Sequence, residues 1–319
     1  MKHIKFTLLI IIGLITATSC KEEKLEAESI FDTETDTQPN ALDKWIIKTY
    51  TRPYNIRINY KFVDNETNIS KNVDPAKEEC AKVLLYYINH VWIESFNELL
   101  GKDFMKNHSP RMFQLIGSSE YNTHDGSETL GIAEGGVKIT LTNVNIADPK
   151  AERNKTYWKR LNKYCFHVIF HEFSHILHQT KNYSTDFNLV SVADYKAGDW
   201  VNLSNADAPQ FGFISGYASK EPNEDFVELI AFYLTEKPDE FTTRVNQGLI
   251  KVDEGNPGQN DIIEIDGKKY DTKQVKKIYN KLAIVKDYMS GNWNIDMDKL
   301  RDIVGRRMDE LKKINVETL

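Results

Sequence analysis

Two histidines and a glutamate stand close together in the run His171-Glu172-Phe173-Ser174-His175, an H-E-x-x-H pattern. Residues four apart lie on one face of a helix, so both imidazoles can point at one place. Zn²⁺ accepts such nitrogens at about 2.0–2.1 Å. The carboxylate of Glu172 would lie beside the metal, where it can take a proton from a metal-bound water as a general base. The pattern therefore predicts a zinc site with His171 and His175 as ligands.

The residues around the pattern indicate a buried helix. We expect this helix to span residues 154–179, because no Pro or Gly interrupts the metal-binding stretch and its apolar residues follow a helical period. A buried histidine or glutamate needs a polar partner, and a metal ion provides one. A pattern of only five residues can also arise by chance in an unrelated chain. The buried helix around it therefore supports the zinc interpretation. The apolar residues are Phe166, Val168, Ile169, Phe170, Phe173, Ile176 and Leu177.

A catalytic zinc site needs a third protein ligand. A third histidine in the common H-E-x-x-H-x-x-G-x-x-H extension is excluded, because Lys181 occupies its position. A glutamate from a later helix is the other common solution, and Glu224 and Glu228 share one face of a helix that Pro222 would open. One carboxylate can bind the metal while the other hydrogen-bonds a ligand histidine. Acidic residues also favour a first helical turn, which is how we interpret Glu221.

With these residues identified, the chain resembles the gluzincin metallopeptidases, in which a glutamate on a following helix completes H-E-x-x-H. The closer resemblance is to the lethal-factor-like pattern, in which a tyrosine stands seven positions before the first glutamate of Glu-x-x-x-Glu. It is also similar to the zinc-binding metallopeptidase lipoproteins of Gram-negative bacteria that take up glycans, over most of the chain outside its C-terminal part. The resemblance implies that zinc is bound by His171, His175 and Glu224, that Glu172 is the base, that Glu228 supports a ligand, and that Tyr217 hydrogen-bonds the oxyanion of the tetrahedral intermediate.

Three further histidines leave alternatives. His167 could pair with the first histidine of the pattern, but the glutamate would then follow the second histidine, so we expect a packed or hydrogen-bonded helix residue. His178 could line the cleft or be exposed. His90 and Glu94 could supply two ligands, although a contact along one helix face is the preferred interpretation.

The first 20 residues predict a lipoprotein signal. A positively charged start precedes a short apolar run at residues 6–15, and Ala17-Thr18-Ser19-Cys20 resembles a lipobox. We expect a signal peptide over 1–19, a lipid on Cys20 and a flexible acidic tether over 20–40. An ordinary signal peptide that contains a cysteine is the alternative. The following Lys21-Glu22-Glu23 resembles a surface-export signal, which favours the outer face of an outer membrane over a periplasm-facing lipoprotein.

The composition sets broad limits. The chain has 319 residues, a net charge of −6 and 40% hydrophobic residues, which permits a large core but offers no basic face for nucleic acid. Besides Cys20, Cys80 and Cys165 could form a disulfide or stay as buried thiols, and no C-x-x-C indicates a thiolate zinc site. Neither pattern nor composition indicates an oligomeric state.

The hydrophobic pattern predicts an α+β fold, with a small mixed β-sheet packed on the active-site helix and a mostly helical C-terminal part after it. The resemblance implies that this fold is zincin-like. We expect a catalytic domain over 41–249 and a C-terminal helical part packed on it over 250–319. The segment 136–141 is expected either to form a wall of the cleft and pair with extended substrate, or to be a plain sheet strand. Strands are expected at 54–63, 111–117, 130–133 and 137–141, with a turn at 135–136; helices at 41–50, 75–100, 222–233, 237–249, 272–289 and 298–314; loops at 181–208 and 253–260; and a short strand with a turn at 261–270.

These inferences predict a zinc-dependent metallopeptidase that cuts a peptide or protein substrate at the cell surface through a zinc-bound water activated by Glu172, while its N-terminal lipid holds it to the membrane. The alternative is a surface lipoprotein that binds glycan or protein and keeps a structural or inactive zinc. The presence of Glu172 and Tyr217 together with three ligands argues against a decayed site.

Overall fold

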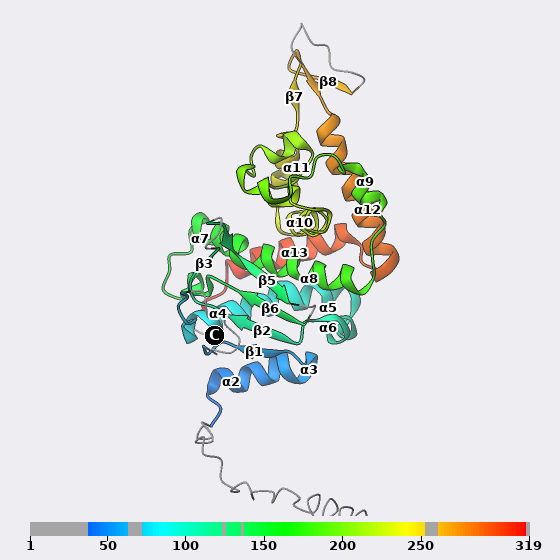
Figure 1. The fold of residues 1–319 in the computed structure, drawn as a ribbon. Coiled ribbons are helices and arrows are strands. Elements are labelled where there is room, and N and C mark those ends of the chain that lie inside the picture. The colour runs from blue at the N-terminus through cyan, green and yellow to red at the C-terminus, as the bar shows by residue number, and fades with distance from the viewer. Residues whose placement is uncertain (1–37, 63–71, 123–125, 135–136, 253–260, 317–319) are drawn as a thin grey trace, which may run out of the picture. The chain divides into compact units, whose positions relative to one another are not determined.

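The computed structural model describes residues 38–62, 72–122, 126–134, 137–252 and 261–316 (Figure 1). The signal peptide expected over 1–19, the lipid expected on Cys20 and most of the expected tether fall outside these residues. The same holds for the turn at 135–136 and the loop at 253–260. Within the described residues, no helix is both long enough and apolar enough to cross a membrane.

A four-stranded mixed sheet lies beneath the helices, in the order β1-β2-β6-β5. β1, β2 and β6 are parallel, and β5 runs antiparallel to β6. β6 therefore has a partner strand on both sides, so it is a plain sheet strand and cannot pair with a substrate. The edge strand next to it is β5. The bounds are β1 Arg57–Asn59, β2 Met112–Leu115, β5 Gly131–Glu134 and β6 Lys138–Leu141.

Two smaller sheets accompany the main one. β3 (Glu120–Tyr121) and β4 (Glu128–Thr129) pair antiparallel. β7 (Ile250–Lys251), β9 (Lys268–Asp271) and β8 (Ile262–Ile265) form an exposed antiparallel sheet in that order. The predicted turn at 261–270 is confirmed as the link between β8 and β9.

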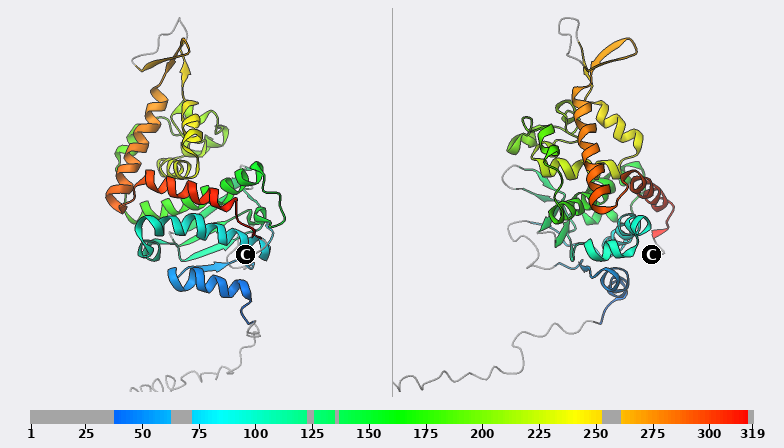
Figure 2. Two further views of the ribbon diagram at one scale, coloured as in Figure 1. Left: turned by 180° about the vertical axis from the view of Figure 1, so that it is seen from behind. Right: turned by 90° about the vertical axis from the view of Figure 1, so that its right-hand side faces the viewer.

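Helices pack on one face of the main sheet (Figures 1 and 2). The longest run in the first half is α4 (Glu78–Ile88), a π-helical turn (Asn89–Ile93) and α5 (Glu94–Leu100), which ends where Gly101 adopts a positive φ of 85°. The remaining helices are α2 Ala41–Ile46, a π-helical turn Ile47–Thr51, α3 Arg52–Tyr54, α6 Lys102–His108, α7 Lys155–Leu161, a π-helical turn Asn162–Phe166, α8 His167–Thr180, α9 Asp186–Val190, α10 Pro222–Thr235, α11 Pro238–Asn246, α12 Lys273–Trp293 and α13 Met297–Leu311.

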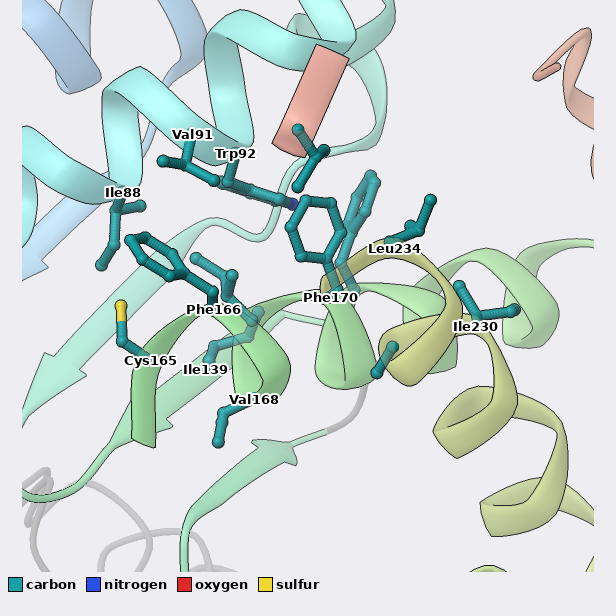
Figure 3. Packing of buried hydrophobic residues seen from close by; sticks show 14 of the residues in the cluster. Ile88, Val91, Trp92, Ile139, Cys165, Phe166, Val168, Phe170, Ile230 and Leu234 are labelled. Carbon is teal, nitrogen blue, oxygen red and sulfur yellow. The ribbon is translucent and has the colours of Figure 1, made fainter. Parts of the chain in front are cut away.

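The core fixes α8 against the sheet through aromatic side chains. The indole of Trp92 makes edge-to-face contacts with Phe113 of β2 (5.9 Å between ring centroids) and Phe173 of α8 (5.2 Å). Figure 3 shows Phe166, which ends the π-helical turn before α8, and Phe170 of α8 pointing toward the helix that carries Trp92. One side of α8 is thus committed to the core, and its other side is available for polar groups.

Several element boundaries differ from the sequence-based expectation. The strand expected from residue 54 begins only at Arg57, because Tyr54 ends a helix and Asn55 takes a left-handed φ of 56°. Pro75 does not open the long helix: it forms an isolated bridge with Ile116, and α4 begins at Glu78. The expected loop at 181–208 contains α9 and a 3₁₀ segment, η6 (Ala197–Asn202).

Two other expectations are settled within the described residues. Helix α12 continues through Gly291, where a break was expected, and ends where Asn294 takes a φ of 56°. Cys80 and Cys165 are both free and buried, so the disulfide alternative is wrong.

The C-terminal helices are joined to α10 by a buried ion pair. Lys281 of α12 lies 2.6 Å from Asp225 Oδ2 of α10, and both side chains are only 1% exposed. Lys281 also donates to the Gly212 carbonyl (2.9 Å), and the Tyr195 hydroxyl donates to Asp225 (3.0 Å). Burial pushes the pKa of Lys281 down and that of Asp225 up, while their mutual attraction opposes both shifts. Each group therefore depends on the other to remain charged inside the protein.

Lys281→Met is expected to lower the free energy of unfolding by about 3–5 kcal/mol, because it leaves the Asp225 carboxylate buried without its cation. The double variant Asp225→Asn/Lys281→Met is expected to recover a large part of that loss, since no unpaired charge remains. Guanidinium unfolding of both variants measures the difference. Equal losses in the single and the double variant would contradict this account of the pair.

Candidate metal centre

The polar side of α8 meets the first two turns of α10. The two helices lie side by side, as Figures 1 and 2 show, and α10 begins at Pro222 as expected. Glu224 lies in the first turn of α10 and Glu228 one turn later, so both carboxylates face α8. Both are buried, with 7% and 5% of their surface exposed.

One oxygen of Glu224 lies between the two histidines of the pattern. Glu224 Oε2 is 3.3 Å from His171 Nε2 and 3.2 Å from His175 Nε2. Two ligand atoms of a tetrahedral zinc ion, each bound at about 2.0–2.1 Å, lie about 3.3 Å apart. The distances from Glu224 Oε2 to the two histidine nitrogens therefore match those between ligands of one zinc ion. His171, Glu172 and His175 also each offer an atom within 4.8 Å of the others, which puts Glu172 in the same cluster.

The second nitrogen of His171 is bound by Glu228. Glu228 Oε1 lies 2.8 Å from His171 Nδ1 and 2.7 Å from His167 Nε2, and Ser215 Oγ donates to its other oxygen (2.5 Å). His171 therefore has a carboxylate at each ring nitrogen. A neutral imidazole has one N–H, so it can satisfy both only if Nδ1–H donates to Glu228 and Nε2 binds a cation. This donor set fits Zn²⁺.

The same arrangement dictates the protonation of His171 in the metal-free protein. Burial alone would lower the pKa of His171, but its hydrogen bonds with Glu224 and Glu228 outweigh burial and raise the pKa to about 10. A proton then occupies the ring nitrogen that the metal would use. Metal binding must displace that proton.

His178 supports His175. The Nε2 of His178 lies 3.0 Å from His175 Nδ1, and His178 is only 7% exposed, so the exposed alternative is wrong. Burial, with a smaller contribution from His175, lowers the pKa of His178 to about 4. A neutral His178 accepts a hydrogen bond from His175 Nδ1–H, and this orients His175 Nε2 toward Glu224.

The remaining oxygen of Glu224 is held by two donors. The Tyr217 hydroxyl donates to Glu224 Oε1 (2.8 Å), and Lys220 Nζ donates to the same atom (3.1 Å). Burial, followed by the charge of Glu224, raises the pKa of Tyr217, so its phenol keeps its proton and acts as a donor. With Oε1 occupied, Oε2 is the oxygen turned toward the histidines.

The structure brings every residue named for the site into this one cluster. It also makes His167 a hydrogen-bonded helix residue, as expected. His167, His171 and Glu228 form a second group within 4.8 Å. We favour the group around Glu224 as the metal site, because Glu228 Oε1 already accepts from both of those histidines. The six site residues are His171, Glu172, His175, Tyr217, Glu224 and Glu228.

Two partners of the site carboxylates, Ser215 and Lys220, were not predicted. Both lie in the segment before α10. Nothing in the spacing of Ser215 marks it as a carboxylate partner, whereas Lys220 stands four residues before Glu224, a spacing that favours an ion pair. His178 was noticed only because it lies three residues after His175. The expected partner of His90 was wrong: its Nε2 contacts Glu310 of α13 (3.0 Å), far along the chain from Glu94.

Replacing His178 tests its support of His175. His178→Leu is expected to weaken zinc affinity by roughly 10–100-fold, because His175 loses the acceptor that fixes its tautomer and orientation. His178→Gln is the matched control, since its side-chain oxygen can still accept from His175 Nδ1–H. Competition of each variant against a chelator of known affinity measures the effect. Equal affinities of the Leu variant and the wild type would refute the supporting role.

Zinc binding is expected to release about one proton near pH 7, because the raised pKa keeps His171 protonated in the metal-free site until the pH approaches 10. The apparent affinity should accordingly rise as the pH rises through the neutral range. Calorimetric titration in two buffers of different ionisation enthalpy counts the proton. Glu228→Gln keeps an acceptor for His171 but removes the negative charge that helps to raise the pKa of His171, so this variant should release fewer protons. An unchanged count in that variant would contradict the assignment.

Comparison with known proteins agrees with this centre. Residues 35–298 match a protein family described as "putative zinc-binding metallo-peptidase". No curated protein matches the chain. The crystal structure of a "putative zinc-binding metallo-peptidase" from Bacteroides caccae ATCC 43185 is similar, with a TM-score of 0.65 and 32% sequence identity over 86% of this chain and 94% of that chain. The match over most of the chain shows that this protein belongs to the family described as "putative zinc-binding metallo-peptidase".

Proposed function

We propose that the protein is a gluzincin-type zinc peptidase that hydrolyses peptide bonds. The observation that carries this proposal is the convergence of Glu224 Oε2 on His171 Nε2 and His175 Nε2, with Glu172 in the same cluster. His171, His175 and Glu224 would hold the metal. When bound, Zn²⁺ polarises a carbonyl and lowers the pKa of a water ligand to about 7.

The protein's own residues supply the proton transfers. Glu172 would accept the proton of the attacking water and give it to the leaving nitrogen, which is general base and then general acid catalysis by one carboxylate. The Tyr217 phenol, which keeps its proton, would donate a hydrogen bond to the substrate oxygen as negative charge develops there. This role requires its hydroxyl to turn from Glu224 toward the substrate.

The ligand set favours a catalytic over a structural metal. Structural zinc sites are closed by four protein ligands, whereas catalytic sites use three and leave one position open. Here three ligands converge, and the side chain of His175 is 15% exposed, so solvent reaches the cluster. This supports the peptidase over a binding lipoprotein with a structural zinc.

We propose that an extended peptide binds along the edge strand β5. At Gly131, an added Cβ would lie 2.2 Å from Val168 Cγ1 and 3.5 Å from Glu172 Oε1, so the backbone of β5 passes close to the catalytic carboxylate. A peptide that paired with β5 as an additional strand would carry its own backbone past Glu172. Pairing with an extended substrate, which the sequence suggested for β6, is therefore assigned to β5 in this proposal.

Glu172→Gln tests the reaction. The variant should keep its zinc but lose about 10²–10⁴-fold in kcat, since the amide cannot take the proton. Digestion of casein or a peptide library, with metal content measured in parallel, gives both quantities. Glu264→Gln, the same chemical change on exposed strand β8, should leave activity unchanged. If zinc is bound but wild type and Glu172→Gln digest equally little, the binding-protein alternative replaces the peptidase.

A further inference from the structure

Trp200 differs from the other four tryptophans, all of which lie in the described residues. Trp92 and Trp293 are buried in the core, and Trp45 and Trp158 pack against it. Trp200 does neither: it is partly exposed on η6, a 3₁₀ segment with no buried residue. Core packing therefore does not explain why this large aromatic side chain stands there.

The ring that Trp200 contacts belongs to the metal centre. Its indole meets the Tyr217 ring edge-to-face, with centroids 4.8 Å apart and an angle of 70° between the planes. The Tyr217 hydroxyl in turn bonds Glu224, whose other oxygen faces the two histidines. Trp200 is thus one side chain away from the ligand atoms.

The segment that carries Trp200 is fastened to the segment η8 (Tyr217–Ser219). Lys196 N donates to the Ser219 carbonyl (2.7 Å), and Gly216 N donates to Asn205 Oδ1 (2.9 Å). An added Cβ at Gly216 would lie 2.0 Å from the Leu203 carbonyl oxygen, so only glycine permits this approach. These contacts, on both sides of Trp200 in the sequence, hold the segment that carries it against the segment that carries Tyr217.

An apolar side chain beside the candidate metal centre can distinguish one peptide substrate from another. The ligands, the base and the donors are all polar and act on the peptide bond, which is the same in every peptide. Discrimination between substrates requires a wall that contacts a side chain, and pockets are commonly lined by aromatic residues. The next residue, Val201, is 41% exposed and extends the apolar character of this segment.

We propose that Trp200 is a specificity-determining residue that receives an aromatic or large aliphatic side chain of the peptide next to the scissile bond. This inference rests on the proposed peptidase function. It predicts that the enzyme prefers peptides carrying such a residue and disfavours those with only small or acidic residues at that position.

The cleavage profile of Trp200→Ala on a peptide library distinguishes a substrate wall from a mere support of Tyr217. The wall predicts a loss in kcat/KM of roughly 10–100-fold for peptides with an aromatic or large aliphatic residue and little loss for those with alanine. Trp200→Phe should retain most of the preference. Leu189→Ala, at a side chain that is 67% exposed on α9, is the control and should keep the wild-type profile. An equal loss on all peptides, or an unchanged profile, overturns the proposal.

A binding measurement separates this inference from the peptidase proposal. Zinc-loaded Glu172→Gln is titrated with a phenylalanine-containing peptide and its alanine counterpart, with and without Trp200→Ala. A preference for phenylalanine that disappears with Trp200→Ala supports the wall even if the wild type proves inactive. Equal binding of the two peptides to zinc-loaded Glu172→Gln overturns it.

Discussion

The carboxylate of Glu228 is the constraint on which the metal centre depends. It is buried, and its two oxygens are satisfied by His167 and His171 of α8 and by Ser215. Burial alone would raise the pKa of Glu228, but these histidines outweigh burial and hold the pKa below its usual range. A buried charge must keep such partners. Two features follow from that requirement: the separation of α8 and α10, and the choice of Nε2 as the nitrogen that His171 would present to a metal.

The site was predictable where one set of residues serves both core and chemistry. In α8 a single helical period places Phe170 and Phe173 toward Trp92 and the histidines on the opposite side. The same period in α10 places Glu224 and Glu228 on one face, behind a proline that suits a first turn. Because these regularities are local, the two helices and their candidate ligands could be inferred from the residues. The choice of Glu224 over Glu228 as the third ligand came from the family resemblance.

Features that depend on distant contacts could not be inferred. Strand alternation marks 137–141 as a strand but says nothing about its neighbours, and only the pairing shows that β5 rather than β6 is the edge. Proline suits a first helical turn, so the sequence predicts that Pro75 opens a helix. In the structure Pro75 instead forms an isolated β-bridge with Ile116. Ser215 contacts Glu228 only after the segment before α10 has folded back onto that helix.

The C-terminal helices belong to the architecture of the site even though no chemistry was found in their sequence. Asp225 directly follows Glu224, and its carboxylate is held by Lys281 of α12. Glu224 and Asp225 point in different directions from one turn of α10, one toward the histidines and the other toward α12. The ion pair therefore fixes that turn from behind, so the position of the proposed third metal ligand depends on a residue 57 positions later in the chain.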